Sequence, residues 1–174
     1  MPGAHPRLPP QLVTLIDHEN KAVAISDFEA IFVPGLLQTG EYARAVISGN
    51  VNVPSDEVDD RVAARLARQN LFSRDRPPRF TFYLHESVLR TPVGGRAVMG
   101  DQLHHLVRMS ARPYLTLRVL PISLGAHAAM TGAFRLMEFA EFKPVAYLES
   151  ETSSLWSFTT PLLTAAAVPP SVAS

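Results

Sequence analysis

The chain has 174 residues, 47% of them hydrophobic, and its 16 basic and 16 acidic side chains cancel, as expected of one domain with one substantial core. It has no cysteine, which excludes disulfides and thiolate chemistry and fits a reducing cytoplasm. It also shows no secretory signal and no apolar run long enough to span a bilayer, so we expect a soluble, cytoplasmic protein that does not contact membranes.

A Pro-rich segment, residues 1–11, precedes the first predicted element. Apolar residues then recur at helical spacing and predict a helix over about residues 11–31. Pro34-Gly35 ends this pattern. Thr39 offers a hydroxyl N-cap for a short second helix, which we expect to end at Ser48.

The rest of the chain mixes helices and strands. Ser55 provides a cap for a third helix, and residues 79–84 alternate in the manner of a strand. A helical turn is predicted over residues 86–90, and a helix that follows two glycines is predicted over residues 96–110. Three further strands are predicted over residues 115–120, 133–139 and 145–148. The inward face of the helix over 96–110 is predicted to be Val98, Met99, Gln102, Leu103, Leu106 and Val107. Because helices come first and strands cluster late, we predict an α+β fold with N-terminal helices and a small mixed or antiparallel sheet.

The charges are distributed unevenly along this neutral chain. Residues 1–60 carry 3 basic and 9 acidic side chains, whereas residues 61–120 carry 11 and 3. Arg61, Arg65 and Arg68 are spaced so that they share one face of the third helix. Because acidic residues stand beside this stripe, we expect Arg–carboxylate pairs within the domain or with a partner protein, and not direct contacts to DNA.

The ionisable residues form no recognisable catalytic set. His85-Glu86 lacks the second histidine of a zinc-protease motif, and Glu86 is expected to pair with Arg90 one helical turn later. His104 and His105 are adjacent on a helix and point about 100° apart, which disfavours a shared metal ion. Neither a phosphate-binding P-loop nor a nucleophile elbow is present. We therefore expect no enzyme activity, no metal and no cofactor.

The most informative segment is the stretch from Val33 to Val46, which reads VPGLLQTGEYARAV. It resembles the VPGLLQT-x-x-YAR box of a bacterial domain family of unknown biochemical function. That domain usually follows an XRE-type helix-turn-helix in WhiJ-like, antitoxin-like regulators of actinobacteria. Later segments that resemble the same family are residues 61–69, 85–90, 93–103 and 119–127, so the similarity covers about residues 12–150.

The resemblance implies a single regulatory domain over residues 12–150, which would be the effector or partner-binding part of a transcriptional regulator. Promoter DNA would be contacted only through a helix-turn-helix, which the Pro-rich residues 1–11 do not supply. Residues 151–174 carry no charge after Glu151, and we expect this Ser-, Thr-, Ala- and Pro-rich tail to be poorly ordered or atypical. WhiJ-like regulators are encoded beside small partner proteins, so a heteromeric partner is implied; a homodimer is a further alternative.

Two surfaces are candidates for function. The first is a partner surface built from apolar, aromatic and arginine side chains, the types that dominate interfaces: Leu36, Gln38, Tyr42, Arg61, Arg65 and Arg68. The alternative for this set is that Leu36, Leu37 and Tyr42 lock the second helix onto the core. The second candidate belongs to a small-molecule sensor, in which a ligand pocket would be framed by Gly94, Gly95 and His127.

Overall fold

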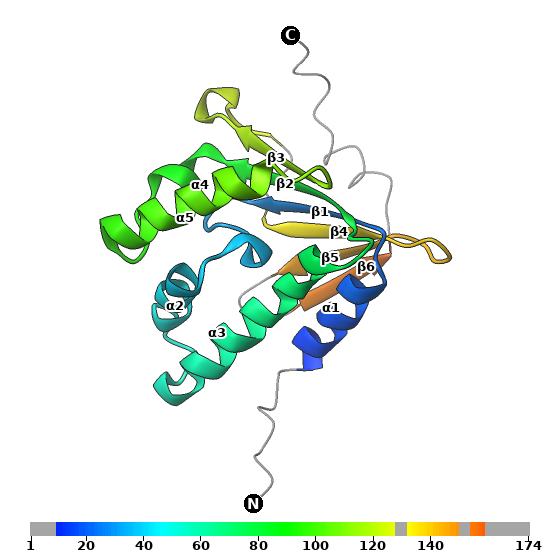
Figure 1. Cartoon of the computed structure of the whole chain (residues 1–174), viewed down its shortest axis with the longest axis horizontal. Coiled ribbons are helices and arrows are strands. Elements are labelled where there is room, and N and C mark those ends of the chain that lie inside the picture. Colours follow the sequence, from blue (N-terminus) through cyan, green and yellow to red (C-terminus); the bar gives the residue numbers. More distant parts are fainter. Residues whose placement is uncertain (1–9, 128–131, 150–153, 159–174) are drawn as a thin grey trace, which may run out of the picture.

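The computed structural model describes residues 10–127, 132–149 and 154–158, which form one six-stranded mixed sheet with helices (Figure 1). The strand order is β3-β2-β1-β4-β5-β6. The first three strands are mutually parallel and the remaining pairings are antiparallel. The bounds of the strands are β1 Ala24–Glu29, β2 Arg79–His85, β3 Leu115–Leu120, β4 Phe134–Glu138, β5 Val145–Glu149 and β6 Ser154–Phe158. The predicted α+β class is confirmed.

The helices pack on one face of this sheet. Their bounds are α1 Pro10–Lys21, α2 Gly40–Ser48, α3 Val58–Ala67, α4 Glu86–Arg90 and α5 Gly95–Ser110. Short 3-10 turns accompany them: η1 Gly35–Leu37, η2 Ser55–Glu57, η3 Arg68–Ser73 and η4 Ile122–Leu124. The main core forms where apolar side chains of these helices meet Ile25, Phe80 and Phe82 of the sheet. Among the described residues, no helix is long and apolar enough to cross a membrane.

The prediction of one helix over residues 11–31 is wrong in its second half. The helix α1 ends at Lys21, and the chain continues into β1, which lies between β2 and β4 inside the sheet. Ile25 and Phe28 of β1 are 0% and 1% exposed and belong to the two core clusters on opposite faces of the sheet. A strand that is buried on both faces loses the alternation that identifies a strand. Ala22, Val23 and Ile25 continued the helical spacing of the preceding residues, and this extended the predicted helix.

Most other local predictions are confirmed. Thr39 caps α2, and its Oγ1 accepts a hydrogen bond from the Tyr42 amide at 3.4 Å. The predicted turn, helix and strands correspond to α4, α5, β2, β3, β4 and β5. The assignment of Val107 to the inward face of α5 is wrong, because Val107 is 69% exposed. The buried stripe of α5 runs through Met99, Gln102, Leu106 and Met109, and Val107 lies about 100° around the helix from Leu106.

The sheet continues beyond residue 150. The strand β6 lies inside the segment that we expected to be poorly ordered or atypical, and it pairs antiparallel with β5. The Pro-rich residues 1–9 and the later tail, residues 159–174, lie outside the described residues.

Candidate functional site

The segment Val33 to Val46 is folded into the interior. Leu36, Leu37 and Tyr42 are each 0% exposed. The Tyr42 hydroxyl accepts a hydrogen bond from the Val33 amide at 3.1 Å, and burial raises the pKa of this hydroxyl. Gln38, which is 3% exposed, donates from its Nε2 to the Val33 carbonyl at 2.7 Å. Both polar groups of the Val33 backbone are therefore satisfied by side chains from the same segment.

A buried glutamine of α5 holds this segment against α5 through hydrogen bonds to its backbone. Gln102 is 0% exposed and uses both ends of its amide. Its Oε1 accepts from the Thr39 amide at 2.7 Å, and its Nε2 donates to the Leu37 carbonyl at 2.8 Å. The loop between η1 and α2 thus has its backbone groups paired by a residue more than sixty positions away in sequence.

The proposed partner surface of this segment is therefore wrong for its buried members. Leu36, Gln38 and Tyr42 are enclosed in the domain and cannot contact a partner in this conformation. Arg65 donates to Gln38 Oε1 at 2.7 Å, which uses its guanidinium inside the domain. The alternative, that the apolar residues lock the second helix onto the core, is confirmed. The Arg61 side chain is 36% exposed, and it forms the predicted pair with Glu57 at 2.7 Å.

Four charged side chains form a buried ion cluster beside this segment: Glu19, Asp27, Arg68 and Arg135. Glu19 of α1 is 1% exposed and lies between the two arginines. Arg68 donates to it from Nη2 at 2.6 Å and from Nε at 2.9 Å, and Arg135 of β4 donates from Nη1. Arg135 also bonds Asp27 of β1 through Nε and Nη2. The cluster is formally neutral and connects α1, η3 and two strands.

The electrostatics of Glu19 follow from this arrangement. Burial alone would raise the pKa of its carboxyl group, because a low-dielectric site disfavours charge. The guanidinium groups of Arg135 and Arg68 outweigh that effect and hold the pKa below its ordinary value of 4.5. Glu19 is therefore ionised at neutral pH and compensates two buried cations. This confirms the expectation that arginines pair with carboxylates inside the domain.

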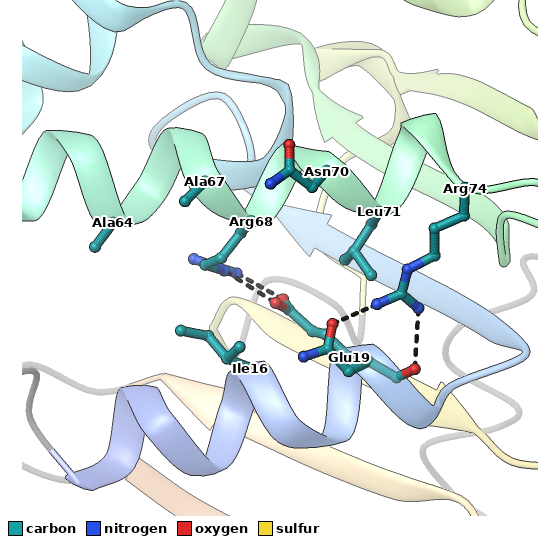
Figure 2. Close-up of a pocket in the computed structure, with 9 residues that line it drawn as sticks. Ile16, Glu19, Ala64, Ala67, Arg68, Asn70, Leu71 and Arg74 are labelled. Atoms are coloured by element: carbon teal, nitrogen blue, oxygen red, sulfur yellow. Dashed lines mark hydrogen bonds and ion pairs between the residues drawn. The ribbon is translucent and has the colours of Figure 1, made fainter.

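A hollow of about 280 Å³ lies between α1 and the helical segment formed by α3 and η3, and Glu19 and Arg68 of the ion cluster line it (Figure 2). Its lining combines small and apolar residues with polar ones: Ile16, Glu19, Asn20, Ala64, Ala67, Arg68, Asn70, Leu71 and Arg74. Figure 2 shows the Glu19–Arg68 pair crossing the gap between the two helices, with Arg74 at one end and Ala64 at the other. We name this feature the α1–η3 hollow.

Comparison with known protein families connects this geometry to one family. A model described as a domain of unknown function (DUF5753) matches residues 12–162, which is most of the chain. The chain belongs to the DUF5753 family. No curated protein and no solved structure matches the chain. The matched range includes β6, so the DUF5753 domain extends past the boundary at residue 150 that the sequence motifs indicate.

The predicted ligand pocket is not assembled in this DUF5753 domain. Gly94 begins α5 with a φ of 68°, and a Cβ there would lie 2.8 Å from Val98 Cγ1 and 3.1 Å from Ala45. His127 lies elsewhere, with its ring 6.0 Å from Phe28 and 6.3 Å from His85. The two glycines and His127 do not line the α1–η3 hollow. Gly94 is therefore a packing and turn residue, because only glycine fits both its φ and the close contact.

The histidines that the structure describes form no metal site. His127 Nε2 is buried without a hydrogen-bond partner in the described structure, and His85 is engaged with Ser87 Oγ at 2.6 Å. Within residues 10–127, 132–149 and 154–158, no group of three or more His, Asp or Glu side chains is arranged to hold a metal ion. Glu86 forms the predicted pair with Arg90, at 2.6 Å, and also accepts from the Ile122 amide at 2.9 Å.

The same end of the sheet carries exposed apolar side chains, which we name the apolar rim: Ile31, Phe32, Ile122 and Leu124. They are 68%, 39%, 54% and 47% exposed. The sequence motifs did not indicate this rim, because an apolar residue in a pattern is normally assigned to the core. The α1–η3 hollow was missed for a similar reason, since Glu19 and Arg68 come from segments far apart in sequence.

Proposed function

We propose that this chain is the effector or partner-binding domain of an XRE-type helix-turn-helix transcriptional regulator of the antitoxin-like type, and that it acts by protein–protein contact. The resemblance of the Val33–Val46 segment supports the regulatory context. The apolar rim supports the mode of action and is the observation that carries the proposal. Exposed apolar residues that gather at one end of a sheet are typical of sites of protein association.

The rim is built on fixed backbone. Its two halves follow the carboxyl ends of β1 and β3, which are separated only by β2 and so lie about 10 Å apart. Side chains of the short helix α4 form hydrogen bonds to the backbone of both halves. Ser87 Oγ donates to the Ala30 carbonyl at 3.0 Å, and the Glu86 carboxylate accepts from the Ile122 amide. A pre-ordered surface loses little conformational entropy when it binds a partner.

Promoter DNA would be contacted through a helix-turn-helix and not through this domain. Each arginine of the α3 stripe bonds to a side chain of the same chain: Arg61 to Glu57, Arg65 to Gln38 and Arg68 to Glu19. They therefore present no continuous basic face to phosphates. A homodimer through the same rim is an alternative outcome of the binding experiment.

The test measures binding of the purified chain to the product of the adjacent small gene by calorimetry. Replacing Ile31 and Ile122 together with Asp should weaken binding at least tenfold, because two apolar contacts would be replaced by charges that lose hydration at the interface. The matched control is Val51→Asp, since Val51 is 96% exposed and lies in the loop between α2 and α3. Unchanged affinity of the double variant, or equal weakening by Val51→Asp, would refute the assignment of the rim. Self-association lost in the double variant would indicate the homodimer.

A second function, the sensing of a small molecule, is favoured by the α1–η3 hollow. Ligand sites are concave, mostly apolar and carry a few placed polar groups, and the hollow has these properties. Its location differs from the pocket that we expected from Gly94, Gly95 and His127.

A further inference from the structure

We propose that the α1–η3 hollow binds a small monocarboxylic acid, with the carboxylate held by Arg74 at one end of the hollow and an apolar body lying between the helices. This inference rests on the sensing function proposed above and specifies its ligand class. It is independent of the apolar rim, which lies at the carboxyl ends of the parallel strands.

The shape of the hollow comes from small side chains on α3. Ala64 and Ala67 face the gap where longer residues would meet α1, and Ile16 and Leu71 add apolar surface (Figure 2). A volume of about 280 Å³ is near the lower end of the range of ligand pockets. It equals the liquid volume of about nine water molecules, so the ligand has on the order of ten non-hydrogen atoms.

The charge of the hollow favours an anion. Glu19 is neutralised by Arg68 from one side and by Arg135 from beneath. Arg74 adds a second guanidinium to the lining, and it donates only to the neutral Asn20, to the carbonyl at 3.0 Å and to Oδ1 at 2.5 Å. Within the described residues Arg74 forms no ion pair. The lining therefore carries one more positive than negative charge, which one carboxylate would balance.

Arg68 is already committed to Glu19. Its side chain is 9% exposed, and its Nε and Nη2 donate to the Glu19 carboxylate. Its Nη1 lies beside Gly35, 3.7 Å from where a Cβ on that glycine would stand, and Gly35 does not line the hollow. Arg74 is therefore the cation of the lining with which a ligand carboxylate would pair.

A monocarboxylate suits this lining better than a phosphate ester. The walls are mainly aliphatic, and the uncompensated charge is a single unit, whereas a phosphate dianion would leave a negative charge unpaired beside Glu19. The ligand would contact both α1 and η3, which the Glu19–Arg68 pair already joins. Binding would therefore stabilise α1 against the rest of the domain, in proportion to ligand occupancy.

The experiment uses the full chain and two acids as probes, hexanoate and benzoate, with hexanamide and benzamide as neutral isosteres. Binding is followed by heteronuclear NMR titration at pH 7. The acids should shift the amides of α1 and η3 in a saturable manner, and the amide isosteres should bind at least tenfold more weakly. Arg74→Gln should weaken acid binding at least fivefold, whereas Arg76→Gln, an exposed arginine two residues away, should leave it unchanged.

Steric closure gives a second test that does not change charge. Ala67→Leu should fill the hollow and remove acid binding, and because Ala67 is exposed the melting temperature should stay within a few degrees. Equal binding of acids and amides, equal losses in both arginine variants, or no binding by any probe would overturn the proposal. Saturable shifts that map to residues around His127 would overturn the proposed site and ligand class while leaving the sensing function in place.

Discussion

The sharpest prediction concerns Glu19→Gln, which removes one charge from the buried cluster and changes almost nothing in shape. The carboxylate accepts three hydrogen bonds from two guanidinium groups. An amide has one acceptor oxygen, and its NH₂ would face an arginine donor. The cluster would change from neutral to a net charge of one, with Arg68 and Arg135 left partly uncompensated in a buried site.

Removing one partner of a buried ion pair typically costs about 3–5 kcal/mol of unfolding free energy, and we expect Glu19→Gln to fall in this range. The matched control is Asp17→Asn on the same helix. Asp17 pairs with Lys21 at 2.7 Å, but its side chain is 56% exposed, so we expect a loss below about 1 kcal/mol. Urea unfolding at pH 7, followed by circular dichroism and by Trp156 fluorescence, measures both values.

The pH dependence gives an independent check on the same residue. Because the folded pKa of Glu19 lies below its unfolded value of 4.5, its stabilising contribution is present above pH 4.5 and is lost as the pH falls through the folded pKa. The difference in stability between the wild type and Glu19→Gln should therefore shrink as the pH is lowered from 6 toward 3. A loss no larger than that of Asp17→Asn, or a difference that does not change with pH, would refute the reasoning.

Two further predictions concern the contacts between α5 and the segment that contains η1 and α2. Gly94→Ala should destabilise the domain by about 1–3 kcal/mol in urea unfolding, since alanine is disfavoured at a φ of 68° and its Cβ would meet Val98 at 2.8 Å. The control is Gly100→Ala inside α5. Because open space surrounds Gly100, this variant should be neutral or slightly stabilising in the same urea unfolding assay. Gln102→Leu should cost about 1–3 kcal/mol for each of the two backbone groups left unpaired, and amide hydrogen exchange should rise at Thr39. Slow exchange at Thr39 in a well-folded Gln102→Leu variant would contradict this account.

Much of the local structure could be predicted because its signals are short-range. Each of these signals acts within one or two helical turns. The structure confirms three of them: the hydroxyl cap at Thr39, the glycine at a helix start at Gly94, and the i, i+4 acid–arginine pair Glu86–Arg90. The fold class followed from the order of these elements.

The central strand and the buried cluster could not be predicted in this way. The strand β1 is buried on both faces, and its pairing with β2 depends on a crossover of about fifty residues. Glu19 and Asp27 fall within a pattern that otherwise reads as apolar. A charge at an inward position of an amphipathic helix is a signal of internal pairing, but its partner Arg135 is more than one hundred residues away. Only the tertiary structure identifies that partner.

The structural role of the Val33–Val46 segment changes where function should be sought. Its most recognisable side chains satisfy backbone groups or fill the core: Tyr42 and Gln38 bond Val33, and Leu36 and Leu37 are fully enclosed. These four side chains stabilise the fold, and in this conformation they are not accessible to a partner or ligand. Solvent reaches both the apolar rim and the α1–η3 hollow, and neither includes a residue of that segment. Two DUF5753 domains with the same segment could therefore bind different molecules, according to which side chains stand at the positions of Ala67, Arg74 and Ile122.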